Sequence, residues 1–532
     1  MLTESRLQEP AADEFYFQGI PPIGSSSADG TKEVTKSQRA RADRQEWLSA
    51  LLLVALDIVI WTLLYGAITE LRGDAYFSTP FDFVVVLGLQ LFVLAQAIYI
   101  IGGYDRKTDM RSLLYTAEHI LAMLAALAVS ALFIYAVTSF ATSMKPSRSA
   151  FLLSFVIFTP ISIFYRRAVD KATAAVTASR AFLVIGSGEL AIDFYRAYRS
   201  SPNRQRLEFV EIEATRIGEH LCGPESPIVE GDLSTKLDRL GHSYSGVILA
   251  ERVDRISPDL LQRLVRTQFQ QTRVYTLESF YEAHWRHVPV SSLDPFWPLQ
   301  MGFQLARNSP YHYLKRLADV VLASLLLVVG SWLLAIIVVA IWLETGRPIL
   351  FRQTRVGREG ELFTALKFRT MFYPARESEL EGQKSEVRSQ TADDGGQEPE
   401  IGTSPFDKED IYTREGDPRI TRIGRWLRKL RFDEIPQLIN VLRGEMSLIG
   451  PRAEWNKCAE RYEKKIPFYH FRHLVKPGIT GWAQVNYPYG EGDADAIEKL
   501  KYDLYYIRHY SLKLDAMIVL KTVHTMLFGK GR

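Results

Sequence analysis

Two adjacent carboxylates, Asp433 and Glu434, follow a segment of the chain that is dense in basic residues. The basic residues of this segment are Arg419, Arg422, Arg425, Arg428, Lys429 and Arg431. Arginines three or four positions apart stack on one surface of a helix, so we expect several of these guanidinium groups to point the same way. A helix with this charge pattern is often only a solvated surface. A second basic pair, Lys367 and Arg369, has apolar neighbours that predict a strand entering a site.

Guanidinium groups beside two carboxylates suit phosphoryl transfer from a diphosphate. The cations would hold the phosphates, one carboxylate would act on phosphorus, and the other would hold a divalent metal ion. A carboxylate can also accept the phosphoryl group itself and form an acyl phosphate. Spacing alone supports this catalytic interpretation and a purely structural one about equally.

The composition of the 532 residues narrows the class of protein. Hydrophobic residues make up 47% and lie in long apolar runs, so the chain is neither mostly disordered nor an evenly mixed soluble globule. The 64 basic and 61 acidic residues leave a formal net charge of +3, which gives no indication of nucleic acid as a partner. Two distant cysteines, Cys222 and Cys458, make a disulfide framework or a cysteine zinc site implausible.

Four apolar segments predict a four-helix transmembrane bundle within residues 46–172. They cover about residues 47–67, 81–101, 120–137 and 150–165, each close to the ~20 residues that cross a bilayer. Basic residues gather after the second and fourth segments, so we expect both ends of the bundle to face the cytoplasm. Residues 1–45 lack apolar periodicity and are interpreted as a disordered basic arm.

Two carboxylates, Asp57 and Glu118, lie within or beside these apolar segments. An ionisable residue at membrane depth can mark a functional site. We favour the alternative, a polar contact between helices or a residue at the level of the lipid headgroups.

Residues 181–295 alternate short apolar strands with helices, which predicts a small Rossmann-like α/β domain with a doubly wound sheet. Strands are expected near 181–185, 209–212, 246–250 and 273–276, with helices over 189–198 and 258–269. The turn Gly186-Ser187-Gly188 fits a dinucleotide fingerprint, and Glu211 or Glu213 would then contact a ribose. A lone fingerprint is weak, so we favour a role in dimerisation or regulation.

A fifth apolar run, residues 317–343, is flanked on both sides by basic residues, which mark the cytoplasmic side of a membrane. These are Lys315 and Arg316 before it, and Arg347, Arg352, Arg355, Arg358, Lys367 and Arg369 after it. A segment that enters and leaves by one face must bend, and Gly330 and Ser331 at its midpoint form a pair that can kink a helix. The alternative is a straight fifth span. Further on, residues about 375–413 are polar and are interpreted as a mobile insertion.

Seven motifs within residues 310–532 closely resemble those of the bacterial polyprenyl-phosphate hexose-1-phosphate transferases, the large monotopic phosphoglycosyl transferases. The motifs are Lys315-Arg316 with Asp319, Gly346-Arg347-Pro348, Arg352-Gln353 with Arg355-Val356-Gly357, Lys367-Phe368-Arg369-Thr370-Met371, and the segments 431–440, 446–452 and 476–486. They differ in composition and occur in the family's order, so the resemblance is specific. It implies a membrane protein of α and α/β regions: the bundle, the Rossmann-like domain, a re-entrant helix and a mainly helical monotopic catalytic domain.

The resemblance also implies a reaction. Asp433 would attack the β-phosphate of a UDP-sugar, release UMP and carry the phosphosugar until undecaprenyl phosphate takes it. Glu434 would bind Mg²⁺. The candidates for holding phosphate are Lys367, Arg369, Arg419, Arg422, Arg428, Arg431 and Arg452. Such an enzyme would reside in the bacterial inner membrane among membrane lipids, with its active site facing the cytoplasm, and would start exopolysaccharide, capsule or O-antigen repeat units.

Two positions depart from the family's pattern. Many members have Ser-Pro at the re-entrant bend, where this chain has Ser331-Trp332, so Gly330 must contribute to the bend. The family's Gly-Pro-Arg-Pro-Glu has Ala453 in place of its second proline. Because Arg452 and Glu454 remain, we expect a loop of altered stiffness and retained function.

Two other functions compete with sugar-phosphate transfer. One is a membrane-bound nucleotide-sugar dehydratase or epimerase, which needs a working NAD site and the Tyr-x-x-x-Lys pair that residues 180–300 lack. The other is a non-catalytic scaffold for polysaccharide assembly, against which the Asp433-Glu434 pair and its basic neighbours argue. The chain is also expected to form a homodimer through residues 181–295. The identity of the sugar cannot be read from the sequence.

Overall fold

The computed structural model describes residues 29–72, 80–140, 147–178, 180–201, 205–212, 216–238, 240, 244–252, 255–270, 272–293, 296–299, 303, 309–372, 419–487, 490 and 492–528. The predicted insertion at 375–413 and the first 28 residues of the predicted arm lie outside this set. By its internal contacts the chain divides into residues 1–47 and residues 48–532.

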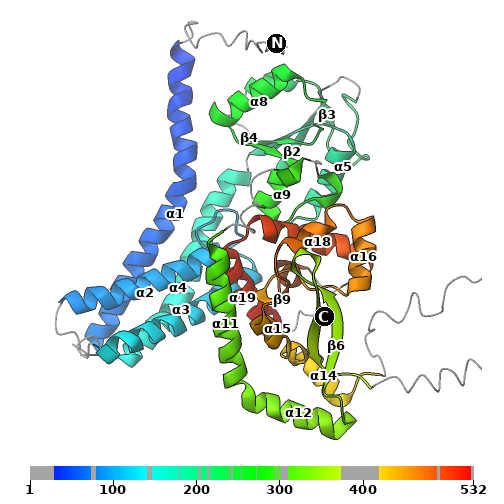
Figure 1. Cartoon of the computed structure of the whole chain (residues 1–532). Coiled ribbons are helices and arrows are strands. Elements are labelled where there is room, and N and C mark those ends of the chain that lie inside the picture. Colours follow the sequence, from blue (N-terminus) through cyan, green and yellow to red (C-terminus); the bar gives the residue numbers. More distant parts are fainter. Residues whose placement is uncertain are drawn as a thin grey trace, which may run out of the picture. The chain divides into compact units, whose positions relative to one another are not determined.

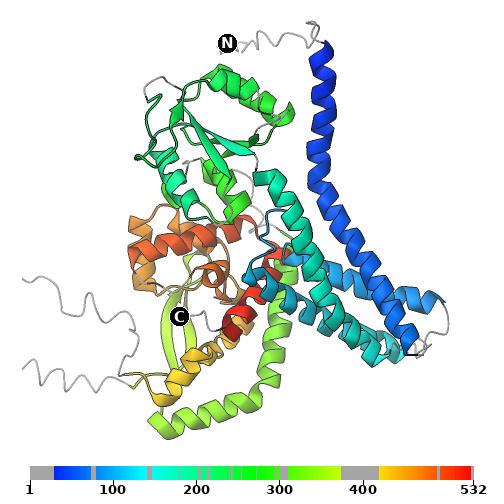
Figure 2. The ribbon, with the colours of Figure 1, turned by 180° about the vertical axis from the view of Figure 1, so that it is seen from behind.

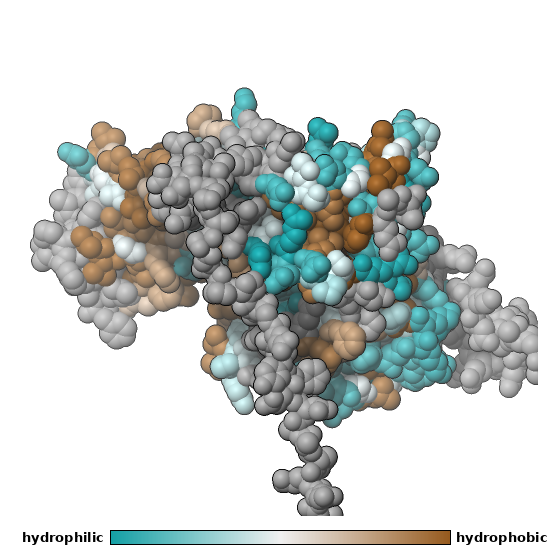
Figure 3. Space-filling view, turned by 90° about the horizontal axis from the view of Figure 1, so that it is seen from above, coloured by the Kyte–Doolittle hydropathy of each residue, from teal (hydrophilic) through white to brown (hydrophobic). Residues whose placement is uncertain are grey.

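The N-terminal half begins with four long helices, α1 (Asp29–Leu71), α2 (Pro80–Ile100), α3 (Leu113–Phe140) and α4 (Arg148–Ala178). Of the described residues, the stretches Leu48–Leu71, Leu113–Ala136 and Arg148–Thr173 are long and apolar enough to cross a membrane, whereas Val84–Ile100 is shorter. Apolar side chains on these helices are exposed, and hydrophobic colour gathers on the bundle in Figure 3. Residues 29–45 of the predicted arm are helical, because their Lys, Glu, Gln, Arg and Ala residues favour a helix.

A buried ion pair joins the first and fourth helices of this bundle. The guanidinium of Arg166 donates to both carboxylate oxygens of Asp57, at 2.9 and 2.6 Å, and the hydroxyl of Tyr104 donates to Asp57 at 2.6 Å. Glu118 pairs with Lys521 of the C-terminal helix at 2.8 Å. The prediction of polar contacts between helices is therefore confirmed for both carboxylates.

Residues 181–276 form a parallel five-stranded sheet of order β3-β2-β1-β4-β5. Its strands are β1 (Ala181–Ile185), β2 (Arg206–Val210), β3 (Val229–Glu230), β4 (Tyr244–Leu249) and β5 (Val274–Thr276). Alternate residues of β1 face opposite sides, where Phe182 and Val184 meet α5 (Glu189–Arg199) and α9 (Leu277–Trp285). On the other side Leu183 and Ile185 meet α6 (Leu233–Asp238) and α8 (Pro258–Gln270). The predicted doubly wound sheet is confirmed, whereas the two-residue strand β3 and the helices α6 and α9 were not predicted.

The fifth apolar run is two helices, α11 (Tyr311–Val329) and α12 (Ser331–Thr345), which meet at an angle of 63° (Figure 1). Gly330 lies at the junction, and a β-carbon there would come within 2.7 Å of the carbonyl oxygen of Leu326. The predicted bend is present where the sequence placed it. A straight helix through this segment is excluded, whereas entry and exit by one membrane face stays a prediction.

The C-terminal region surrounds an antiparallel hairpin of β6 (Leu350–Val356) and β7 (Leu362–Phe368). In Figures 1 and 2 this hairpin lies beside α14 (Arg422–Lys429) and α15 (Gln437–Arg443), which the short turn η6 (Phe432–Glu434) connects. The largest apolar core of this region includes Leu500, Leu504 and Ile507 of α18 (Asp493–Arg508). The remaining elements are η3 (Val290–Ser292), η4 (Trp297–Leu299), η5 (Arg358–Gly360), β8 (Ser447–Ile449), α16 (Asn456–Lys465), η7 (Tyr469–Leu474), β9 (Gly478–Thr480), α17 (Trp482–Asn486), α18 (Asp493–Arg508) and α19 (Leu512–Phe528).

Candidate active site

Asp433 and Glu434 lie in the short turn η6, not in a long helix. Helix α14 ends at Lys429, and Arg431 then adopts a left-handed conformation with φ of 61°. A residue with a β-carbon is rarely found in this region, and such residues cluster at functional sites. Pro436 precedes the first residue of α15, so a new helix starts at once. The two carboxylates are thus held between two helices.

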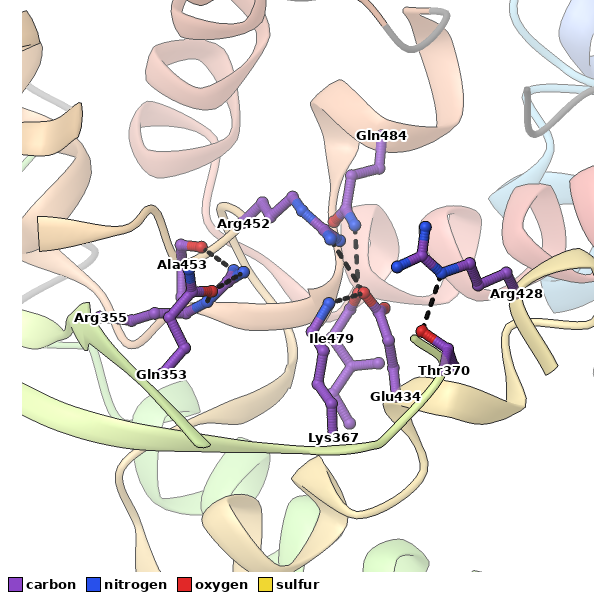
Figure 4. A network of polar contacts seen from close by, with 10 residues as sticks. All are labelled: Gln353, Arg355, Lys367, Thr370, Arg428, Glu434, Arg452, Ala453, Ile479 and Gln484. Carbon is purple, nitrogen blue, oxygen red and sulfur yellow. Dashed lines mark hydrogen bonds and ion pairs between the residues drawn. The ribbon is translucent and has the colours of Figure 1, made fainter. Parts of the chain in front are cut away.

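The Glu434 carboxylate is buried and bound by two cations (Figure 4). Nζ of Lys367, from β7, lies 2.8 Å from Oε1 of Glu434. Nη2 of Arg452, from the loop after β8, lies 2.8 Å from the same oxygen. Two charge-assisted hydrogen bonds to one oxygen fix the side chain in place.

The electrostatics distinguish the two neighbouring carboxylates. Burial alone would raise the pKa of Glu434, but Arg452 and Lys367 outweigh it and hold that pKa well below its usual value. Burial, and secondly the charge of Glu434, raise the pKa of Asp433. Among the described residues nothing donates a hydrogen bond to Asp433. Its carboxylate is therefore both more basic and less engaged than that of Glu434, as a nucleophile requires.

Arg428 brings a third cation to this region. Its Nε donates to Oγ1 of Thr370 at 2.9 Å, and its charge lowers the pKa of Asp433. Figure 4 shows its guanidinium directed toward the Glu434 side of the cluster. The structure thus gathers Asp433, Glu434, Lys367, Arg428 and Arg452, with Arg431 in the adjoining turn.

Three other predicted phosphate-holding residues have different positions in the described structure. Arg369 is buried and donates to the carbonyl oxygens of Thr345 and Gly346, at 2.5 and 2.8 Å, where α12 ends. The side chain of Arg422 is exposed at the start of α14, and Arg419 is exposed next to Met371 and Phe372. None of the three contacts Glu434.

Sequence reasoning gave no role to residues that hold the Arg452 loop. Arg355 donates to the carbonyl oxygen of Ala453, and Arg472 donates to the carbonyl oxygen of Arg452 at 3.0 Å. Gln484 lies beside Arg452 in Figure 4 and donates to the carbonyl oxygen of Ile479 at 3.1 Å. Arg355 and Gln484 belong to the family motifs named above, and this membership could have identified them from the sequence.

Two adjacent carboxylates are a donor set that could hold a Mg²⁺ ion only together with ligands from a substrate, such as phosphate oxygens. Among the described residues no group of three or more His, Cys, Asp and Glu side chains could hold a metal. Mg²⁺ is commonly bound by one or two carboxylates together with phosphate oxygens. Both hydrogen bonds to Glu434 use Oε1, which leaves Oε2 available as a ligand.

Residues of the glycine-rich turn in the sheet domain already contact other residues of that domain. Gly186 has φ of 116°, and a β-carbon there would lie 2.7 Å from the carbonyl oxygen of Ala250. The hydroxyl of Ser187 donates to Glu211 at 2.9 Å, and Arg216 donates to the Ser187 carbonyl at 2.5 Å. The predicted ribose-contacting Glu211 is thus already engaged, and Glu213 lies outside the described residues.

Comparison with known proteins places residues 310–529 in the family described as bacterial sugar transferase. A UDP-N-acetylgalactosamine-undecaprenyl-phosphate N-acetylgalactosaminephosphotransferase of Aeromonas hydrophila is 34% identical over 336 residues, covering 63% of this chain and 69% of that protein.

Two further relatives match over shorter regions. A UDP-glucose:undecaprenyl-phosphate glucose-1-phosphate transferase of Escherichia coli K12 is 38% identical over 41% of each chain. An undecaprenyl-phosphate galactose phosphotransferase of Salmonella typhimurium is 33% identical over 44% of each chain. The three relatives carry three different sugars in their names.

Proposed function

Because this chain belongs to the bacterial sugar transferase family, we propose that it moves a hexose-1-phosphate from a UDP-sugar to undecaprenyl phosphate. The observation that carries the proposal is the contrast between two adjacent carboxylates. Glu434 accepts hydrogen bonds from Lys367 and Arg452, whereas Asp433 accepts none from the described residues. The relatives are named for this kind of reaction, which supports the reaction class. Their names give three different sugars, so the sugar used by this chain stays open.

In the proposed mechanism Asp433 is the nucleophile. Its carboxylate oxygen bonds to the β-phosphorus of the UDP-sugar, and the bridging P–O bond breaks so that UMP leaves with the electron pair. The phosphate oxygen of undecaprenyl phosphate then attacks the same phosphorus and displaces Asp433. The carboxylate is regenerated and no water is consumed. In this proposal Lys367, Arg428 and Arg452 hold the phosphates during both steps.

We propose Glu434, with Asp433 nearby, as the protein ligand for Mg²⁺. When bound, the ion would neutralise phosphate charge and help UMP to leave. Lys367 and Arg452 fix the orientation of Glu434 through their hydrogen bonds to Oε1. Arg431, adjacent to the pair, is a further candidate for a substrate phosphate.

We place the enzyme in the bacterial inner membrane with this site on the cytoplasmic side, where nucleotide sugars occur. Apolar helices of spanning length and the 63° bend between α11 and α12 support a membrane bundle and a re-entrant segment. The sheet domain is proposed as a dimerisation or regulatory domain. Polysaccharide initiation, of exopolysaccharide, capsule or O-antigen, is the proposed role of the product.

A direct assay tests the reaction. Purified full-length protein in detergent with undecaprenyl phosphate and Mg²⁺ should release UMP from one or more of UDP-glucose, UDP-galactose and their N-acetylated forms. UMP release should depend on the lipid acceptor for multiple turnovers, and the lipid product should contain a diphosphate-linked hexose. Absence of release across the panel, from protein that elutes as a folded species, would refute the proposal.

A further inference from the structure

The last turn of α12 meets the first turn of α14, the helix that leads to the active-site turn (Figure 1). Oε1 of Glu344 accepts a hydrogen bond from the backbone N–H of Arg422 at 2.7 Å, and Oε2 accepts one from the N–H of Ile423 at 3.1 Å. Arg422 and Ile423 are the first two residues of α14, and N–H groups at this position have no partner within the helix. A side chain of one helix thus caps the start of another, 78 positions further along the chain.

The other contacts at the start of α14 come from its own N-cap and from the segment after β7. Oγ1 of Thr421 accepts from the N–H of Gly424 at 2.8 Å, and the N–H of Thr421 donates to the carbonyl oxygen of Thr370 at 3.0 Å. A β-carbon at Gly424 would lie 2.1 Å from that carbonyl oxygen, so α14 approaches the end of β7 very closely. Thr421 therefore satisfies one N–H group of the first turn, and Glu344 satisfies two.

Arg369 fixes the end of α12 that carries Glu344. Its buried guanidinium donates to the carbonyl oxygens of Thr345 and Gly346, where the negative end of the helix dipole favours a cation. Two positions earlier, Lys367 binds Glu434. One short segment after the hairpin thus holds both the active-site carboxylate and the end of α12.

The last turn of α14 carries Arg428 to the active site. Nε of Arg428 donates to Oγ1 of Thr370, and the charge of Arg428 lowers the pKa of Asp433. Only Leu430 and Arg431 separate α14 from the turn that contains Asp433. A displacement of α14 would therefore move Arg428 relative to the carboxylates.

The direction of α14 depends on contacts with other elements, because a helix of eight residues is not stable by itself. Its apolar residues Ile423 and Leu427 pack with Ile337 and Ile341 of α12. Apolar packing tolerates sliding more readily than a pair of directed hydrogen bonds does. The Glu344 cap is thus the contact that sets where α14 begins along α12.

We propose that Glu344 is a positioning residue for sugar-phosphate transfer, because its cap on α14 places Arg428 beside Asp433. The inference rests on the proposed function, in which Arg428 holds a substrate phosphate. It also gives Arg369 a role other than phosphate binding, since Arg369 fixes the end of α12 from which Glu344 reaches α14. The second helix of the bent apolar pair is in this way attached to the active site.

A double-mutant cycle with Arg428 tests this role. Glu344→Ala removes the cap, so we expect kcat/KM for UMP release to fall about tenfold or more, because a misplaced phosphate-binding group is costly. In an Arg428→Gln background the same change should cost less than about twofold, since no guanidinium is left to place. Equal fold-losses in the two backgrounds would overturn the inference, because Glu344 would then act independently of Arg428.

The conservative variant Glu344→Gln separates capping from charge. Its amide oxygen can still accept a hydrogen bond from the start of α14, so it should recover most of the rate that Glu344→Ala loses. If Glu344→Gln is as slow as Glu344→Ala, the charge of Glu344 and not its cap matters, and the inference is wrong. The matched control Glu460→Gln removes an exposed carboxylate of α16 and should keep the wild-type kcat/KM.

Amide hydrogen exchange measures the cap without any substrate. The amides of residues 422–424 should exchange faster in Glu344→Ala than in wild-type protein, and at the wild-type rate in Glu460→Gln. Equal exchange in Glu344→Ala and the wild type would overturn the inference. Thermal unfolding of the same samples shows that folded proteins are compared. Absence of UMP release from the wild type would instead refute the proposed function, and faster exchange in Glu344→Ala would still show the cap, so the two failures are distinguishable.

Discussion

Nζ of Lys367 and Oε1 of Glu434 lie 2.8 Å apart, although 67 positions separate the two residues in the sequence. This ion pair connects the β6–β7 hairpin to the turn that holds both carboxylates. Arg452 donates to the same oxygen from a third segment. Glu434 therefore fixes the geometry around Asp433, and Asp433 itself accepts no hydrogen bond from the described residues.

Replacing the proposed nucleophile tests covalent transfer. Asp433→Asn is nearly isosteric but cannot attack as an anion, so we expect transfer to fall at least about a thousandfold while the fold is kept. UMP release and thermal unfolding would be measured on the same sample. Turnover at the wild-type rate, in protein shown by mass spectrometry to be free of deamidation, would exclude a covalent aspartate intermediate.

Replacing the buried acid tests the proposed metal ligand. Glu434→Gln removes one negative ligand atom, so we expect about tenfold or more Mg²⁺ to be needed for half-maximal rate, together with a lower rate. A Mg²⁺ titration of initial velocity measures both. A titration curve that coincides with that of the wild type would remove Glu434 from the metal site.

The pH dependence tests the coupling between Lys367 and Asp433. The reaction needs ionised Asp433. Burial, and secondly the charge of Glu434, raise the pKa of Asp433, whereas the charge of Lys367 lowers it. Lys367→Met removes an opposing cation, so the pKa of Asp433 should rise further. The acid limb of kcat/KM should then move to higher pH, and the rate should fall about tenfold or more. The exposed Lys464→Gln is the matched control, and a shift of the limb to lower pH in Lys367→Met would contradict the assignment.

Cysteine labelling tests the membrane topology. In a Cys222→Ser background, where the remaining Cys458 is buried, cysteines introduced one at a time at Arg347 and at Lys171 should both react only with reagent from the cytoplasmic side. Gly330→Leu/Ser331→Leu should favour a straight span, because a side chain at position 330 meets the Leu326 carbonyl oxygen. Labelling of the Arg347 position from outside intact cells, in protein that keeps Gly330 and Ser331, would rule out the re-entrant segment.

Deleting residues 181–295 tests the role of the sheet domain. We expect a lower oligomeric state in nanodiscs with partial transferase activity, because a membrane-tethered domain can pair with a second copy at low entropic cost. Added NAD should change neither, since Ser187, Glu211 and Arg216 already bind one another. Tight NAD binding with a nicotinamide absorbance change during turnover would instead show a second catalytic domain.

Local properties of the sequence were sufficient for much of this protein. Apolar run lengths predicted long helices, alternation predicted the parallel sheet, and Gly330 predicted the bend, because each depends on neighbours in the chain. The adjacency of Asp433 and Glu434 is likewise a property of the sequence alone. The partnership of Asp57 with Arg166, 109 positions away, was foreseen only as some contact between helices.

Only the tertiary structure decided which cations reach the carboxylates. Lys367 and Arg369 are two positions apart, and a continuing strand would point both side chains to one face. Strand β7 instead ends at Phe368, so Lys367 reaches Glu434 whereas Arg369 turns to the carbonyl oxygens at the end of α12. Arg452 joins Glu434 because Arg355 and Arg472 hold its loop. Such choices depend on where distant segments pack, and residue type and spacing do not contain that information.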